Sequence, residues 1–383
     1  MKIAHTADWH LGKIIFQTKL LQEQTLLLED FCRSLEEQQP DVLIIAGDVY
    51  DRSVPPSEAV ELLDQTLNRI VMDLAIPVLM ISGNHDSPER IHFGSSFMRQ
   101  MGLHVRGKLD GFDHPVTFED AFGPVDFFLL PYADPAEVKM LLKDESLHTH
   151  QAAYEKLIER IKAHQTPGRR TVLITHAFIA GGTESESERP LSVGGSSVVE
   201  AGLFKDFTFT ALGHLHRPQD IISQKIHYSG SLMKYSFSEA LHTKSYSLIE
   251  LTPDTVTIQK IPLKTKRDLR IIKGHFEEIL EKGRTDTNNE DFILAIIEGE
   301  KAILNPIEKL RSVYPNIMKI EREAFAYNRN SKLTVKERES KTDMELFQAF
   351  FEQVNPENTV FTPEMKTVVD DIFSTLYKED DHS

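Results

Sequence analysis

Residues 42–52 have the sequence VLIIAGDVYDR, in which five apolar residues are followed by a glycine and a polar cluster. A short apolar run bounded by turn residues is typical of a strand that is buried on both faces of a sheet. The polar cluster Gly47–Arg52 begins where this strand is expected to end. Ligands of open α/β sheets bind outside the carboxyl ends of the strands. The segment therefore predicts both an α/β sheet and the edge at which a site would form.

The same arrangement recurs along the first two-thirds of the chain. Helix-patterned segments separate the first strands, as at Leu20–Gln38 and Ser57–Leu74. Alternating strands and helices predict a sheet with helices on its faces. The strands predicted here are Lys2–Ala7, Val42–Gly47, Val78–Ser82, Phe127–Pro131, Thr171–Thr175 and Phe207–Leu212. Antiparallel strands are predicted to follow at Ile226–Ser229, Ser245–Leu251 and Thr255–Pro262.

The pattern changes near Leu263, and four regions are expected. Residues 1–264 would form the main domain, and residues 265–327 a small α/β domain. Residues 328–341 are polar and are expected to form a linker. Residues 342–383 carry two apolar stripes at helical spacing, which predict a pair of helices. Such stripes either fold back on the chain's own core or dock a partner, and the preceding linker favours docking.

Composition narrows the class of protein. Of 383 residues, 40% are hydrophobic and 27% are charged, as in ordinary globular chains. No apolar run is long enough to span a bilayer, and the first residues lack the layout of a signal peptide. The single cysteine, Cys32, fits a reducing compartment, so a cytoplasmic location is expected. The net charge of −16 argues against a surface that coats DNA, although the basic stretch Lys260–Lys273 could still contact a DNA backbone.

Five polar clusters follow predicted strands and would converge if those strands end side by side. The clusters are Asp8-Trp9-His10, Gly47–Arg52, Gly83-Asn84-His85-Asp86, Thr175-His176-Ala177 and Gly213-His214-Leu215-His216. Their Asp, Asn and His side chains suit manganese, iron or zinc better than calcium. Seven such ligands are too many for one small cation, and they match two cations bridged by a carboxylate. Each cluster alone could be an ordinary turn or cap, but all five in order favour a metal site.

These clusters resemble the calcineurin-like metallophosphoesterase signature, which is D-x-H, G-D-x-x-D-R, G-N-H-D, a lone histidine and G-H-x-H. More narrowly, the chain resembles the SbcD family of bacterial nuclease subunits, which pair with an SMC-like ATPase. The narrower resemblance rests on Met1–Gly12, Gly47–Pro55, Ser82–Arg90, Leu191–Gly195, Tyr228–Ser231 and Lys234–Glu239. The resemblance implies an α/β fold in which a calcineurin-like domain, a two-sheet sandwich flanked by helices, precedes a small α/β capping domain and a C-terminal helical pair.

The resemblance also implies two bound manganese ions, or magnesium or other divalent ions in their place. One ion would be held by Asp8, His10, Asp48 and His216. The other would be held by Asp48, Asn84, His176 and His214, with Asp48 bridging.

Four further residues are candidates for substrate chemistry. By the resemblance, His85 would face the phosphate as general acid or charge stabiliser. An imidazole can donate a proton near neutral pH to a poor alkoxide leaving group. Asp51 would orient His85 by accepting a hydrogen bond. Arg52 and Arg90 flank the expected site and could contact phosphate.

The function implied by the resemblance is a manganese-dependent DNA nuclease. It would be a 3'-to-5' exonuclease on duplex ends and an endonuclease on single strands or hairpins, in DNA repair, recombination and replication. Its partners would be DNA and an SbcC-type SMC-like ATPase bound through the C-terminal helices. Two copies of the chain would form a homodimer within a heterotetramer. The protein would be nucleoid-associated and would not bind a membrane. Of two alternatives, the first stays open, and the complete ligand set and His85 count against the second. A phosphatase or nucleotide phosphodiesterase would share every metal ligand, whereas a non-enzymatic scaffold would have lost some of them.

Overall fold

The computed structural model describes residues 1–188, 197–299, 303–322, 342–354 and 361–380. The chain divides into two compact units, Met1–Arg270 and Ile271–Ser383. The Leu191–Gly195 motif and the expected linker 328–341 lie outside the described residues. Among the helices that the structure describes, none is long and apolar enough to cross a membrane.

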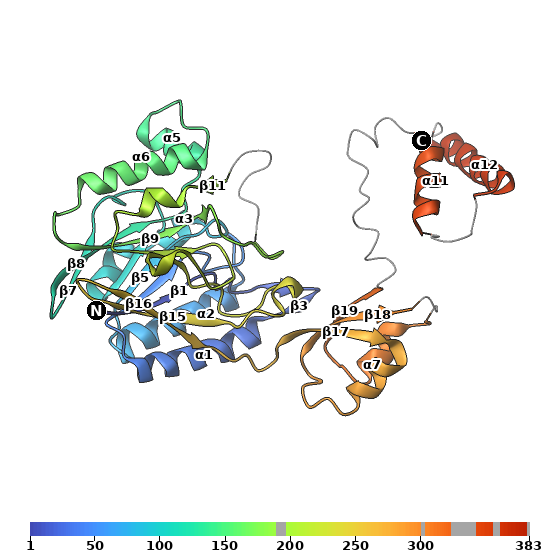
Figure 1. Ribbon diagram of the computed structural model, residues 1–383, viewed down its shortest axis with the longest axis horizontal. Helices are drawn as coiled ribbons and strands as arrows, with labels where there is room; N and C mark the ends of the chain where they lie inside the picture. Colours follow the sequence, from blue (N-terminus) through green and yellow to red (C-terminus); the bar gives the residue numbers. More distant parts are fainter. Residues whose placement is uncertain (189–196, 300–302, 323–341, 355–360, 381–383) are drawn as a thin grey trace. The chain divides into compact units, whose positions relative to one another are not determined.

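The first unit contains two six-stranded sheets (Figure 1). The first has the strand order β16-β15-β1-β4-β5-β6. Its strands are β1 (Lys2–Thr6), β4 (Val42–Ala46), β5 (Val78–Ile81), β6 (Leu103–Arg106), β15 (Ser245–Leu251) and β16 (Val256–Pro262). β1, β4, β5 and β6 are parallel, and β15 and β16 form an antiparallel edge. Every residue of β4 is buried, which explains its unbroken apolar sequence.

The second sheet has the order β13-β14-β12-β9-β8-β7. Its strands are β7 (Val116–Asp120), β8 (Gly123–Leu130), β9 (Arg170–His176), β12 (Phe209–Gly213), β13 (Gln219–Ile222) and β14 (Ile226–Tyr228). The inner four are parallel, and β7 and β13 are antiparallel edges. The sequence pattern did not predict these two edges, because no residue in either strand is fully buried and apolar runs are absent from both.

The two sheets pack face to face through a core that β1, β4 and β5 share with β8, β9 and β12. Helix α6 (His150–Ala163) covers the outer face of the second sheet. Helix α1 (Leu21–Gln38) lies on the first sheet, where the ring centroids of Phe31 and Tyr246 are 5.1 Å apart. Helix α2 (Ser57–Asn68) continues into a π-helical turn, Arg69–Asp73. The predicted two-sheet sandwich flanked by helices is confirmed.

The shorter elements are β2 (Ile14–Ile15), β3 (Thr18–Lys19), α3 (Pro88–His92), α4 (Ser95–Met98), α5 (Pro135–Leu142), β10 (Phe178–Ile179) and β11 (Val198–Val199), with single 3-10 turns at Arg99–Met101, Ala201–Phe204, Ser223–Lys225 and Phe237–Glu239.

The second unit contains a small sheet and a helical pair. The sheet has the order β17-β18-β19, with a core that includes Phe276, Ile293 and Leu310. Its elements are β17 (Leu269–His275), α7 (Phe276–Gly283), β18 (Phe292–Glu298), α8 (Pro306–Arg311) and β19 (Ile317–Arg322). The two helices predicted at the end of the chain are present as α11 (Asp343–Val354) and α12 (Pro363–Asp380).

Candidate metal centre

The carboxyl ends of five strands meet at one site. β1, β4 and β5 of the first sheet and β9 and β12 of the second each run into one of the polar clusters. The amides of Asp8 and His10 donate to the carbonyls of Gly47 and Asp48, each at 3.0 Å. The Asp8 carboxylate accepts the amide of His214 at 3.0 and 3.2 Å, across 206 positions of sequence. Loops from both sheets are therefore bonded directly to one another.

Asp8, His10 and His216 form the first buried group, here called the His10–His216 group. No member is more than 1% exposed. The Nε2 atoms of His10 and His216 lie 3.1 Å apart, and Asp48 Oδ2 lies 3.7 Å from His10 Nε2. One ligand atom from each of the three residues falls within 4.8 Å of the others. Such a cluster of nitrogen and oxygen atoms can hold one cation.

Asn84, His176 and His214 form the second group, the His176–His214 group. The Asn84 side-chain oxygen lies 2.9 Å from His176 Nε2 and 3.2 Å from His214 Nδ1. Asp48 Oδ2 lies 3.5 Å from His176 Nε2, so the same carboxylate oxygen faces both groups. The structure thus brings together all seven side chains that were predicted as metal ligands.

Three glycines make this packing possible. A Cβ on Gly213 would lie 1.9 Å from the Ala46 carbonyl oxygen, and a Cβ on Gly83 would lie 2.1 Å from Asp48 Oδ1. A Cβ on Gly47, whose φ is +88°, would lie 2.5 Å from His176 Nδ1. Each glycine precedes a candidate ligand because the neighbouring loop passes too close to admit any side chain.

Four of the candidate ligands have strained backbones. The φ angles of Asp8, His10, Asp48 and His214 are 54°, 44°, 47° and 108°. Residues with side chains rarely adopt positive φ, and each instance costs on the order of 1–3 kcal/mol. Strain of this kind persists where surrounding contacts enforce it, and it clusters at functional sites. Here the hydrogen bonds between the loops hold these residues in their strained conformations.

Burial and mutual charge set the protonation of the site. Burial lowers the pKa of His10 and of His214 well below the ordinary value, so both imidazoles are neutral and offer lone pairs. Burial would also lower the pKa of His176, but the adjacent Asp48 carboxylate raises it to about 9. The His176 charge in turn holds the pKa of Asp48 well below its usual range, against the opposing effect of burial. The neutral imidazoles of His10 and His214 beside carboxylates fit divalent cations that accept nitrogen and oxygen ligands, and a cation would displace the proton from His176.

Comparison with known proteins identifies the family. The model of the calcineurin-like phosphoesterase family matches residues 1–218. The chain belongs to this family. The SbcD C-terminal model, described as the Type 5 capsule protein repressor C-terminal domain, matches residues 265–355, and the two matches together are consistent with the SbcD family.

Two solved structures match part of this chain. The protein TT1561 of Thermus thermophilus is 14% identical with a TM-score of 0.40, and the match covers 68% of this chain and 98% of that one. A dimetal phosphatase from Danio rerio is 13% identical with a TM-score of 0.41, and the match covers 68% of this chain and 95% of that one.

His85 of the phosphoesterase lies at the edge of the candidate metal centre. Its ring is 4.7 Å from the His10 ring, and its amide donates to Asp48 Oδ1 at 2.8 Å. Its Nδ1 donates to the main-chain carbonyl of Asp51 at 2.8 Å. The predicted hydrogen bond from His85 to Asp51 therefore needs one correction, because the acceptor is the carbonyl and not the carboxylate. The Asp51 carboxylate instead pairs with Lys13 at 2.8 Å.

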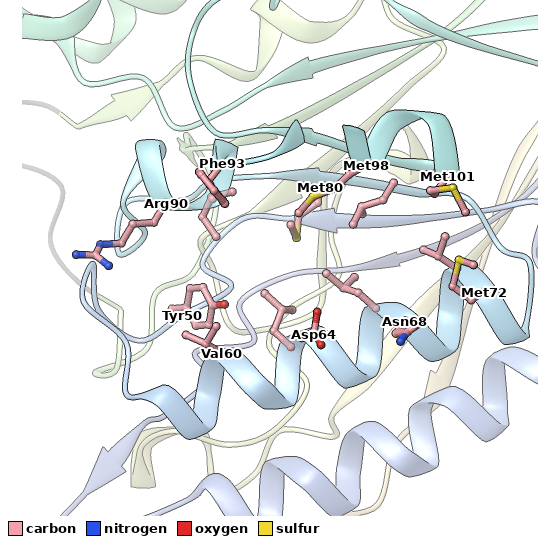
Figure 2. A pocket seen from close by; sticks show the side chains of 15 residues that line it. Tyr50, Val60, Asp64, Asn68, Met72, Met80, Arg90, Phe93, Met98 and Met101 are labelled. Atoms are coloured by element: carbon pink, nitrogen blue, oxygen red, sulfur yellow. The ribbon is translucent and has the colours of Figure 1, made fainter. Parts of the chain in front are cut away.

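The two predicted arginines occupy different surroundings. Arg52 has a side chain 54% exposed and lies 3.9 Å from the Asp51 carboxylate, near the site. Arg90 is on α3 and lines an apolar groove beside α2 (Figure 2). Part of the basic stretch Lys260–Lys273 is already paired with acidic groups, since Arg267 bonds Glu23 at 2.5 Å and Lys273 lies 3.6 Å from Glu298.

Several residues that support the centre were not predicted. The Asp86 carboxylate accepts amides of Val49, Tyr50 and Gly83 at 2.9–3.1 Å and so ties two of the clusters together. Burial raises the pKa of Asp86 to about 6. Asp86 is the last residue of the G-N-H-D cluster, so the cluster itself could have identified it as part of the site. Glu239 and Lys244, both buried beside His216, had no ligand-type signal in the sequence.

Proposed function

We propose that this metallophosphoesterase is a two-metal DNA nuclease, the nuclease subunit of a DNA-processing complex. The observation that carries the proposal is the convergence of both ligand groups on Asp48, with His85 at their edge. The SbcD C-terminal domain supports a nuclease over a small phosphatase. The proposed activities are 3'-to-5' exonuclease on duplex ends and endonuclease on single strands and hairpins, in DNA repair, recombination and replication.

The proposed ligand sets follow the two groups. The His10–His216 group with Asp48 would hold one divalent cation, and the His176–His214 group with Asp48 would hold the other. Two bound manganese ions, or other divalent ions, would supply Lewis-acid activation of the phosphodiester and of the attacking water. The Ala46 carbonyl accepts from His176 Nδ1 at 2.9 Å and thereby leaves Nε2 directed at the ligand cluster.

His85 would donate a proton to the departing sugar oxygen. A main-chain carbonyl can only accept, so the bond to Asp51 fixes a proton on Nδ1. Nε2 is then the atom that exchanges a proton with substrate. The hydrogen bond from the His85 amide to Asp48 holds His85 beside the carboxylate that would bridge the two cations. Arg52, which lies 3.9 Å from the Asp51 carboxylate, and Arg90 are the two arginines proposed to contact phosphate.

The nuclease proposal is tested with three substrates in manganese buffer. We expect cleavage of linear duplex DNA and of bis-p-nitrophenyl phosphate, with little hydrolysis of p-nitrophenyl phosphate. Hydrolysis of the monoester alone would assign the chain to the phosphatases. The His85→Gln variant serves as the background for each substrate.

We propose that the C-terminal helices bind the SMC-like ATPase subunit. Met365, Val368 and Ile372 share one face of α12 and are 38%, 59% and 53% exposed. Such a stripe suits helix-in-groove or coiled-coil docking. Truncation before Lys341 should abolish co-purification with the ATPase and leave hydrolysis of bis-p-nitrophenyl phosphate intact. Undiminished co-purification would contradict the proposal.

We also propose that a second copy of the chain covers the apolar groove beside α2, which has a volume of about 370 Å³. Figure 2 shows Val60, Asp64 and Met72 on one wall, with Phe93 and Met101 on the other. Phe93 is 81% exposed, and an apolar surface of this kind typically marks an interface.

The charges beside this groove favour a second copy as its occupant. The α2 wall exposes Glu61 and Asp64, and the opposite wall exposes Arg90 and Arg99. A two-fold axis would place each acidic wall against a basic wall. Phe93→Glu, at a groove-lining side chain 81% exposed, should convert a dimer to a monomer in light scattering, whereas Phe122→Glu, on the turn between β7 and β8, should not. A monomeric wild-type chain would contradict the proposal.

A further inference from the structure

His216 is held by a chain of three side chains that ends in a buried ion pair. Its Nδ1 lies 2.8 Å from Ser187 Oγ, which donates its proton to Glu239 Oε1 at 2.5 Å. Since that hydroxyl proton is committed to the carboxylate, Ser187 accepts from His216 Nδ1–H. The proton is thereby fixed on Nδ1, and Nε2 faces His10 with its lone pair available.

The side chain of Lys244 binds the main chain of His216. Its ammonium donates to the His216 carbonyl at 2.8 Å and to the Glu239 carboxylate at 2.5 Å. It also donates to Ser231 Oγ at 2.7 Å, so all three protons of the ammonium have acceptors. The Lys244–Glu239 pair thus contacts His216 at both its ring and its backbone.

This ion pair lies in the interior of the domain. Glu239 is 0% exposed and Lys244 is 6% exposed. Taking two charges out of water costs free energy that their attraction often fails to offset, so a buried pair is poor evidence for stabilisation. A role in fixing geometry is the better account of a pair that contacts a candidate ligand at two points.

We infer that Glu239 and Lys244 are positioning residues for the cation of the His10–His216 group. Glu239, acting through Ser187, sets the tautomer and the ring orientation of His216, and Lys244 fixes the strand-end backbone that carries it. The inference rests on the proposed metal ligands and not on the identity of the substrate. Loss of an outer partner of a metal-binding histidine typically weakens metal affinity roughly 10–100-fold.

The test is manganese binding by calorimetry to the full chain, together with the electron paramagnetic resonance signal of a manganese pair. Glu239→Gln should weaken one of two binding steps roughly 10–100-fold and leave the other unchanged. The spin-coupled signal should then need a correspondingly higher manganese concentration. Ser187→Ala, at a half-buried position that does not threaten the fold, should weaken the same step by a smaller factor. Lys244→Arg keeps the charge and should retain more affinity than Lys244→Met.

The control is Asp120→Asn, which weakens the partly buried Asp120–Arg170 pair, 2.5 Å long, between the edge strand β7 and the first residue of β9. It should lower the unfolding temperature in chelator without changing either binding step. Equal weakening of both steps by Glu239→Gln, or no change in either, would overturn the inference. A wild-type chain that binds fewer than two manganese ions would overturn both the inference and the ligand sets. Two bound ions with no DNA cleavage would overturn only the nuclease proposal.

Discussion

The two halves of the candidate metal centre are held in different ways. In the His176–His214 group, His176 is oriented by the Ala46 carbonyl, which belongs to a central strand of the first sheet. In the His10–His216 group, His216 is oriented by Ser187 and Glu239, which lie outside the strands. The first half therefore depends on sheet geometry, and the second on particular side chains. Side-chain substitutions among the residues that orient these two histidines should therefore affect only the second half.

The largest expected effect comes from removing the carboxylate that both halves share. Asp48→Ala should abolish binding of both cations. Each cation contributes several kcal/mol of charge stabilisation, and 1.36 kcal/mol is tenfold, so cleavage should fall by more than about 10⁴-fold. Manganese stoichiometry and cleavage rate measure the effect, with Asp254→Ala, at an exposed turn between β15 and β16, as control. Wild-type affinity for either ion would show that Asp48 does not bridge.

The next effect separates chemistry from metal binding. His85→Gln should lower the cleavage rate by roughly 10²–10⁴-fold, the range of a lost general acid. Both manganese binding steps should stay as in the wild type, because His85 would donate a proton and hold no metal. His148→Gln, an exposed histidine on the surface, is the control. Loss of a manganese ion in His85→Gln would reassign this residue as a ligand.

A third substitution changes the His176–His214 group, whose geometry depends on the sheet. In Gly213→Ala the new Cβ would stand 2.8 Å from His176 Nδ1 as well as against the Ala46 carbonyl. Overpacking at such a site costs about 1–3 kcal/mol or more, so the free energy of unfolding should fall by that amount. Gly202→Ala is the control, because no atom lies within 4 Å of its added Cβ. Chemical denaturation of both variants gives the comparison, and equal stability would contradict the close approach.

The last prediction concerns the contribution of the cations to stability. Manganese at about 100 times its Kd should stabilise the folded domain by about 2.7 kcal/mol for each site. Thermal unfolding with manganese and with chelator measures the difference. The stabilisation by manganese should be halved in Glu239→Gln at a concentration that fills both sites of the wild type but only the stronger site of the variant. An identical shift in both proteins would mean that the two halves do not differ in the way described.

The sequence was informative where a residue's role follows from its place at a strand end. The seven candidate ligands come directly after or at the ends of five parallel strands, so strand prediction alone was enough to expect their convergence. Glu239 and Lys244 could not be found in this way, because they lie beyond the clusters and meet His216 only in the folded chain. The acceptor on Asp51 could not be predicted either, since a sequence does not distinguish a carboxylate from the carbonyl of the same residue. The edge strands β7 and β13 were missed because their apolar residues are too few.

The order of the chain has a consequence for the timing of its synthesis. Asp8 and His10 follow β1, yet the neighbouring strand β15 begins at Ser245, and His216 and Glu239 also come late. A growing chain on the ribosome cannot assemble either ligand group until more than half of it has been made. A phosphoesterase built this way is inert as a short nascent fragment, and any product that terminates before His216 lacks a complete ligand set.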